Sequence, residues 1–242
     1  MSLLELLVAS ALGLLITMGV MTGYLGIKSN NNFQQVLSDL QDSGRFAQTI
    51  LNQRIRVAGF VGCVDGLNPV DQNQAIIGYS SDHLPAFLQG QVAAGTDAVV
   101  VKSCISHSNI SKDAALKTMA YYIGDTHRKN QQGQTILALF QKPADGEREE
   151  LIAGVEQMQL LYGVLVDSTA NSVTYYPAAQ IVDWETVRSV QIDLLLNSID
   201  AVLTKPQPYY FHGQVIAPSD LLLHKPWSTY VTLRDLNNDI GH

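Results

Sequence analysis

Few residues of this sequence have chemistry that is unusual for their position, and Glu5 is the clearest case. It is the only charged residue before Lys28 in an otherwise apolar N-terminal segment. A carboxylate inside a membrane costs roughly 3 kcal/mol unless it is paired or lies near the interface. Ser2, three residues earlier, completes the S-x-x-E pattern of a capping box, whose two side chains satisfy N–H groups of the first helical turn. The pattern therefore predicts a helix that begins at Ser2 and is capped by Glu5.

The remaining residues form no catalytic or metal-binding pattern. The zinc-protease, nucleophile-elbow, phosphate-loop and dinucleotide motifs are all missing. Residues 235–241 resemble a calcium loop only loosely, since the glycine is one place late and no distal glutamate follows. The six histidines have no ligand spacing and are expected to be surface or satisfied core residues: His83, His107, His127, His212, His224 and His242. The sequence therefore predicts no enzyme, no metal site and no cofactor.

The two cysteines, Cys63 and Cys104, are too few for a zinc site and match no metal spacing. In an oxidising compartment a disulfide between them would be the natural state. Closing a loop of that size would stabilise the fold by on the order of 4 kcal/mol in the chain-entropy model. Two buried free thiols are the alternative, and both interpretations stay open.

The charge balance bears on nucleic-acid binding. The chain has 22 acidic and 15 basic residues, a net charge of −7. A broad phosphate-contact surface would need a basic stripe, which is missing. A local basic site around His127, Arg128 and Lys129 would support at most weak, salt-sensitive contact, and a solvated loop is the plainer interpretation of that triplet.

The N-terminal segment predicts one long helix that meets two solvents. Leu6 to Ile27 is an uncharged run of 22 residues, about 33 Å as a helix and enough to cross a bilayer core. Beyond it, residues 33–58 place apolar or small side chains at steps of three and four, which indicates an amphipathic helix. No proline interrupts residues 1–58, and Gly59 is a plausible stop. No basic n-region precedes the apolar run, so a cleavable signal peptide is a poor interpretation.

The apolar half of this helix contains glycines that would allow close contact with other helices. Gly19 and Gly23 form a GxxxG motif. The candidate helix-packing residues are Gly13, Gly19, Gly23 and Gly26.

The chain divides into three parts. Residues 1–28 form the transmembrane half of the helix, 29–59 its amphipathic half, and 60–242 a β-rich extracytoplasmic head. Strands are expected at 74–78, 98–103, 119–123, 135–141, 157–166, 172–176, 189–196 and 230–234, where short apolar runs lie between turn residues. Short helices are expected at 111–117 and 220–224, and a charged turn at 143–150. A long helix followed by antiparallel strands makes an α+β fold.

The N-terminal sequence SLLELLVASALGLLITMGV resembles the mature N-terminus of class III signal-peptide proteins, which are type IV pilins, minor pilins and secretion pseudopilins. In these proteins a prepilin peptidase removes a leader, and the new first residue, usually phenylalanine, is N-methylated. Glu5 matches their glutamate at the fifth mature position. Met1 stands where phenylalanine is expected, and Thr22 where major pilins often have proline.

More of the chain resembles one minor pilin family, PilW. SGRFAQTILNQRIRVAGFVGC is similar to the end of that family's helix and the turn after it. GTDAVVVKS resembles its first strand after a variable loop, and VEQMQLLYGVLVD with WETVRSVQIDLLLNS resembles its C-terminal sheet. YVTLRDLNN resembles its closing strand, where Arg234 matches and Asp235 departs from the usual asparagine.

The resemblance implies a type IV pilin-like fold and a structural role in starting pilus assembly, with a place in the pilus tip that supports twitching motility, adhesion or DNA uptake. The implied partners are other minor pilins, a tip adhesin, the major pilin, the inner-membrane assembly platform, the prepilin peptidase and membrane lipid. The implied location is the inner membrane with a periplasmic head, then the pilus tip. Glu5 would pair with the terminal amine of a neighbouring subunit. A type II secretion pseudopilin is the close alternative, and a membrane-anchored periplasmic enzyme or binding protein a more distant one.

Overall fold

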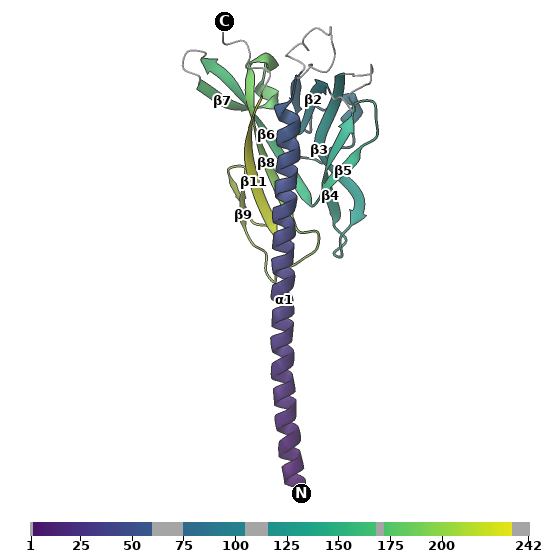
Figure 1. Ribbon diagram of the computed structural model, residues 1–242, viewed down its shortest axis with the longest axis vertical. Helices are drawn as coiled ribbons and strands as arrows, with labels where there is room; N and C mark the ends of the chain where they lie inside the picture. The colour runs from purple at the N-terminus through teal and green to yellow at the C-terminus, as the bar shows by residue number, and fades with distance from the viewer. Residues whose placement is uncertain (1, 60–74, 105–115, 168–171, 234–242) are drawn as a thin grey trace, which may run out of the picture.

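The computed structural model describes residues 2–59, 75–104, 116–167 and 172–233. A single long helix, α1, carries a β-rich head on its C-terminal half (Figure 1). The elements are α1 (Leu3–Arg56), β1 (Ile76–Tyr79), η2 (Ala86–Leu88), β2 (Ala98–Cys104), β3 (Leu116–Lys129), β4 (Thr135–Pro143), β5 (Glu149–Ala153), β6 (Val155–Asp167), β7 (Ser172–Pro177), η3 (Ala178–Gln180), η4 (Trp184–Thr186), β8 (Val187–Asn197), β9 (Tyr209–Phe211), β10 (Gln214–Ile216) and β11 (His224–Thr232). This is the predicted α+β arrangement of a long N-terminal helix on antiparallel sheets.

The helix α1 is continuous over 54 residues, about 81 Å at 1.5 Å per residue. Its C-cap is Val57, and Gly59 follows with a φ of +82°, a left-handed conformation that costs glycine little. The N–H of Gly59 donates to the Lys102 carbonyl at 2.9 Å, which attaches the end of the helix to β2. The helix therefore ends slightly before the predicted stop, with Gly59 two residues beyond the C-cap.

The amphipathic half of α1 buries the predicted stripe of small and apolar residues against the head. Ala47, Leu51, Ile55 and Ala58 are fully buried, and Leu40 is nearly so. Phe33, Val36, Leu37 and Ile50 are partly buried against the same core. Burying a leucine-sized side chain stabilises by about 1.5–3 kcal/mol, so this face of the helix supplies much of the head's core.

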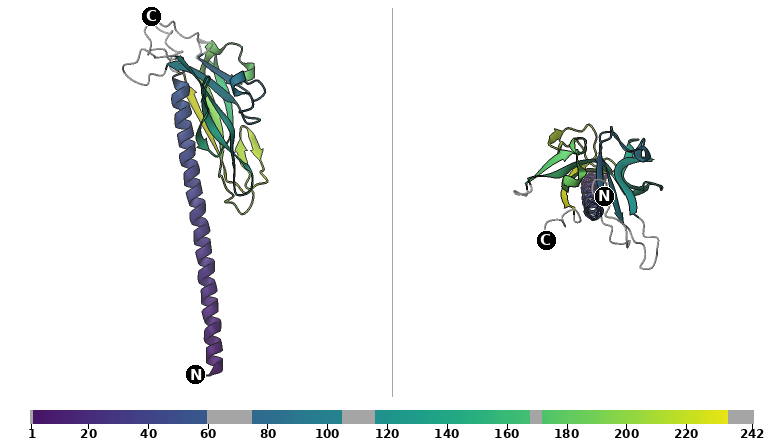
Figure 2. Two further views of the ribbon diagram at one scale, coloured as in Figure 1. Left: turned by 90° about the vertical axis from the view of Figure 1, so that its right-hand side faces the viewer. Right: turned by 90° about the horizontal axis from the view of Figure 1, so that it is seen from above.

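The head contains two antiparallel sheets, one on each side of α1 (Figures 1 and 2). The first has the strand order β1-β2-β3-β4-β5, and the second has the order β11-β8-β6-β7. Viewed from above, the helix lies between the two sheets (Figure 2). Alternate side chains of β8, among them Val190, Ile192 and Leu194, point into the same core as the buried face of α1.

The chain passes from the first sheet to the second at Gly154, between β5 and β6. Gly154 has a φ of +78°, donates its N–H to Leu137 of β4 at 2.8 Å and accepts from Asn197 of β8 at 2.8 Å. A Cβ at this position would lie 2.8 Å from the Asn197 carbonyl oxygen. Both the φ angle and the close approach therefore require glycine where the two sheets join.

Two smaller units cover the outer faces of the sheets. A second core, which includes Leu88, Tyr122 and Phe140, lies between η2 and the outer face of the first sheet. The β9–β10 hairpin, a two-stranded sheet of its own, covers part of the second sheet. The side chain of His212 in its turn reaches Asp193 of β8, with 3.4 Å between Nδ1 and the carboxylate.

Several local predictions were wrong. The helix expected at 111–117 is contradicted by β3, which begins at Leu116; residues 111–115 lie outside the described ranges. The helix expected at 220–224 is instead extended chain leading into β11. Its backbone groups form hydrogen bonds with residues outside the segment. The Leu221 carbonyl accepts from the N–H groups of Val202 and Leu203, and the Leu223 N–H donates to Ser198 Oγ.

Two strand boundaries also differ. The turn expected at 143–150 is shorter, since β5 begins at Glu149, and β11 begins six residues before the strand expected at 230–234. Pro226 is tolerated within β11 because β11 is an edge strand.

The helix packs tightly on the head at Gly44, where a Cβ would lie 2.4 Å from the Trp227 ring. We predict that Gly44→Ala destabilises the head by about 1–3 kcal/mol through overpacking, although alanine favours helix by about 1 kcal/mol over glycine. Thermal unfolding of the full chain in detergent micelles measures this. The matched control is Gly26→Ala, where a Cβ meets nothing within 4 Å. Equal stability of the two variants would contradict the predicted steric conflict.

Candidate assembly surface

The N-terminus of α1 has the predicted cap. Ser2 is the N-cap, and its Oγ accepts from the Leu4 N–H at 3.3 Å. The Glu5 carboxylate accepts from the Ser2 N–H at 3.1 Å. Both side chains are exposed, so the other carboxylate oxygen of Glu5 is free to meet a second partner. The position proposed for methylation, Met1, lies outside the described residues.

The first half of α1 is exposed all round. Its large apolar side chains from Leu3 to Ile27 keep 51–79% of their surface exposed. It contains an 18-residue window with a mean hydropathy of 2.2 that is not buried by the head. A soluble monomer seldom exposes a contiguous apolar patch of more than a few hundred Å². This half of the helix is thus long and apolar enough to span a membrane.

Three hydroxyl groups of this half donate to carbonyls of the helix itself. Ser10, Thr17 and Thr22 donate to the carbonyls of Leu7, Gly13 and Gly19 at 2.8–2.9 Å. In hydrocarbon an unsatisfied polar group costs several kcal/mol, on the order of 4–8 by cyclohexane transfer. The helix therefore presents no unpaired hydroxyl to lipid at these positions.

The four glycines predicted for helix packing have open space around them. A Cβ at Gly13, Gly19, Gly23 or Gly26 would meet nothing within 4 Å. Nothing in the described single chain therefore requires glycine at these positions. Contact with another helix, or local loosening of α1, would explain them, and their role stays a prediction.

The attachment of α1 to β11 includes polar contacts that the sequence did not predict. Gln48 and Asn52 donate from their side-chain amides to Thr229 Oγ1, at 2.9 and 3.5 Å. Together with the Gly44–Trp227 contact, these two hydrogen bonds fix the position of the helix along the head. Gln48 and Asn52 are four residues apart, so the sequence could place them on one face of the helix beside the apolar stripe. Nothing in the sequence identified β11 as their partner.

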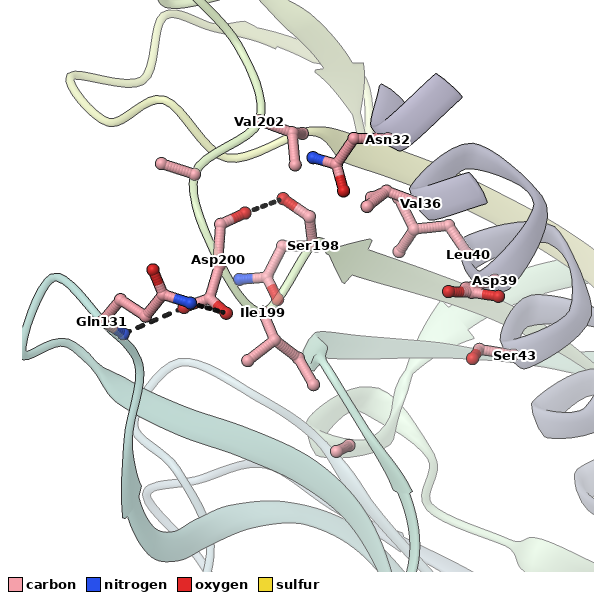
Figure 3. Close-up of a pocket in the computed structure, with 13 residues that line it drawn as sticks. Asn32, Val36, Asp39, Leu40, Ser43, Gln131, Ser198, Ile199, Asp200 and Val202 are labelled. Atoms are coloured by element: carbon pink, nitrogen blue, oxygen red, sulfur yellow. Dashed lines mark hydrogen bonds between the residues drawn. The ribbon is translucent and has the colours of Figure 1, made fainter. Parts of the chain in front are cut away.

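A cavity of about 350 Å³ lies between α1 and the loop after β8, at the end of the head nearest the apolar half (Figure 3). Asn32, Val36 and Leu40 line its helix side, and Asp200 lies opposite them. The Asp200 carboxylate accepts from the Gln131 N–H at 2.9 Å and from its side-chain amide at 3.2 Å (Figure 3). Because the carboxylate already holds together two loops, the cavity has no evident catalytic or metal-binding arrangement.

A cluster on β8 contains the residue types of a hydrolytic triad but not its geometry. Buried Asp193 accepts from Ser228 Oγ and from the Gln191 amide, and lies 3.4 Å from His212 Nδ1. In a triad the histidine lies between the carboxylate and the serine. Here both Ser228 and His212 contact the carboxylate, so the serine is not activated. Among the described residues no group of three or more metal-ligating side chains comes together.

A buried histidine, His224, lies at the start of β11, and its side chain is 2% exposed. Its ring nitrogens lie 3.1 Å from Glu156 of β6 and 3.0 Å from Asp220, and Tyr209 of β9 stacks on the ring at 4.6 Å. Burial lowers the pKa of His224, but the hydrogen bonds to Glu156 and Asp220 outweigh burial and raise the pKa above its usual value. Burial and the same two carboxylates raise the pKa of Tyr209 to about 12, so Tyr209 stays neutral.

The charged form of His224 should therefore stabilise the head. Because its pKa is higher in the folded than in the unfolded chain, the contribution is complete below the unfolded value of about 6.5 and is lost as pH rises through the folded pKa. We predict that His224→Gln removes a fall in melting temperature that the wild type shows as pH rises above about 6.5. The control is His83→Gln, an exposed histidine. An unchanged pH profile in His224→Gln would contradict this role.

The structure leaves other predicted site residues separate or undescribed. Cys104 ends β2, and its side chain and all of Cys63 lie outside the description, so the disulfide stays a prediction. In the basic triplet, Arg128 pairs with Glu150, and His127 lies 3.7 Å from Asp125. These nearby carboxylates weaken the case for a local phosphate-binding site. Residues 235–241 also lie outside the described ranges.

Comparison with known proteins agrees with this architecture. Residues 120–235, from β3 to beyond β11, match the family model described as Type IV Pilus-assembly protein W. Over this region the chain is similar to the PilW family. The matched region contains the whole second sheet, including the Thr229 and Trp227 contacts with α1. The match does not include α1.

A type IV-like pilin from Thermus thermophilus is a similar solved structure. It shares 13% sequence identity, with 81% of this chain and 97% of that chain covered and a TM-score of 0.46. So distant a likeness carries no part of the PilW assignment. No curated protein matches the chain.

Proposed function

We propose that this PilW-type chain is a minor pilin that helps to initiate type IV pilus assembly and sits in the tip complex of the pilus. The observation that carries the proposal is the continuous helix α1, whose first half suits lipid or a helical bundle and whose second half is built into the head. A simple membrane anchor would not need to be continuous with the core of its domain. The family match supplies the connection with type IV pili.

In this proposal the subunit waits in the inner membrane with its head in the periplasm, after a prepilin peptidase has processed the precursor. It then associates with other minor pilins, a tip adhesin, the major pilin and the assembly platform, and ends at the pilus tip. Its role is structural and non-catalytic, in support of twitching motility, adhesion or DNA uptake. Direct DNA contact would be weak and local, given the net charge of −7.

Two other functions share some of these features. A pseudopilin of a type II secretion tip complex would have the same helix, and loss of protein secretion with normal piliation in a deletion strain would favour it. A membrane-anchored enzyme or binding protein would tolerate an unrelated anchor in place of residues 1–28. Replacing residues 1–28 would leave the buried residues 40–58 in place. The replacement therefore tests the anchor separately from the core of the head.

Deletion of the gene tests the proposed function. We predict a sharp loss of surface pili, restored by the full chain expressed in trans, because a tip complex must form before the fibre extends. Pili are counted by electron microscopy and in sheared surface fractions. Normal piliation, together with failure to crosslink any other minor pilin, would contradict the proposal.

The function of Glu5 is tested separately. We propose that its carboxylate pairs with the terminal amine of a neighbouring subunit, so that the two charges leave lipid together. Glu5→Gln retains the capping hydrogen bond to Ser2 but cannot neutralise an ammonium group. We predict that Glu5→Gln reduces incorporation into pili by about tenfold, roughly the effect of 1.4 kcal/mol, with unchanged membrane insertion and head stability.

The control for this experiment is Ser2→Ala, which removes only the cap of the Leu4 N–H. Immunoblots of sheared pili and of membranes give the two readouts. If Glu5→Gln enters pili as well as the wild type, self-capping is the whole role of this residue.

A further inference from the structure

The two main sheets have four outer strands, and three of them are protected against pairing with another chain. β1 lies against η3, and β11 carries Lys225 and Pro226 and contacts α1. β5 begins with Glu149 and Glu150. Charge, proline and covering elements are the usual means by which an edge strand avoids adding a foreign strand.

The fourth outer strand, β7, differs from these three, because it carries no charge and its one proline, Pro177, is its last residue. Its sequence, SVTYYP, has no charged residue and is rich in β-branched and aromatic residues, which favour strands. Ser172, Val173 and Thr174 are exposed. Within the described ranges its backbone pairs only with β6, so its outer N–H and C=O groups can accept another strand. β7 lies at the end of the head far from the apolar half of α1 (Figure 1).

A groove of about 310 Å³ lies beside this edge. Its apolar lining comes from Val164 of β6, Tyr176 of β7, and Ile181 and Val182 of the following loop. Val182 is 99% exposed, which is unusual for a large apolar side chain. Because strand side chains alternate between faces, every second residue of a strand added to β7 would lie on the face of Tyr176, over this groove.

A second membrane-anchored copy does not suit this edge. Antiparallel pairing is the more stable form, and between two copies of β7 it requires a two-fold axis that reverses the strand direction. The strands of the second sheet run roughly along α1 (Figure 1). Such an axis would point the two helices in opposite directions, whereas copies in one membrane have parallel helices.

We infer that β7 is a docking edge for an extended, uncharged strand of a different protein, which pairs antiparallel with β7 and places apolar side chains in the groove of Val164, Tyr176, Ile181 and Val182. Main-chain hydrogen bonds would supply the affinity and the groove the specificity. The inference rests on the sheet edges and not on the place of the chain in a pilus.

The test uses the full chain in cells, with the photocrosslinking residue p-benzoylphenylalanine at position 174 or, in a separate strain, at position 176. Mass spectrometry then maps the crosslinked positions. We expect both probes to reach one extended segment of the same partner, about two residues apart and in reverse order, as antiparallel pairing requires. Backbone amides of 172–176 should also exchange more slowly in the captured complex than in the purified chain.

Two substitutions show whether the edge itself is responsible. Thr174→Lys adds the charge that β7 lacks, and with the probe at position 176 we expect the crosslink yield to fall at least about tenfold. Glu149→Lys, on the edge of β5, is the matched control and should leave the yield unchanged. Melting temperatures of both variants establish that the head is folded.

Several outcomes would overturn the inference. Crosslinks scattered over a partner's surface would indicate side-chain docking, and crosslinks only to a second copy would indicate self-association. Full yield in Thr174→Lys would show that the edge is not used. Absence of any crosslinked product from a normally expressed and folded chain would also contradict it.

Discussion

The burial of one face of α1 between the two sheets is the interaction on which the rest of the structure depends. Leu40, Ala47, Leu51 and Ile55 belong to the same core as the inner residues of β8 and β6. The same helix continues without a break into a half whose apolar side chains are exposed all round. A helix rooted in the head in this way fixes the position of the apolar half relative to the head, which a flexible linker would not do.

The head is shaped to receive that helix. Gly154 lets the chain cross from the first sheet to the second, so that the sheets stand on either side of α1. Gly44 then allows the Trp227 ring to approach the helix backbone, while Thr229 binds two side-chain amides of the next turns. These contacts fix the depth and rotation of the helix.

The helix could be predicted in detail from the sequence because its signals are local. The S-x-x-E cap, the steps of three and four from Phe33 to Ala58, and Gly59 each depend on neighbours within a few residues. The arrangement of the sheets could not be predicted, because Gly154, Trp227 and the His224 cluster depend on residues far apart in sequence. The expected helix at 220–224 failed for the same reason: Ser198 and Val202 take its backbone groups.

The continuity of α1 from its apolar half into the head is tested most directly by a scan of spin-label accessibility along the helix. Spin labels carried by a noncanonical amino acid are placed singly at positions 6–58 of the full chain in lipid vesicles. The structure predicts uniform contact with lipid-dissolved oxygen over the apolar run, then accessibility that oscillates with a period of about 3.6 residues from 33 to 58, with minima at Leu40, Ala47, Leu51 and Ile55. Highly mobile labels around 28–32, or no periodicity beyond them, would show a separate anchor and contradict a single helix shared by membrane and head.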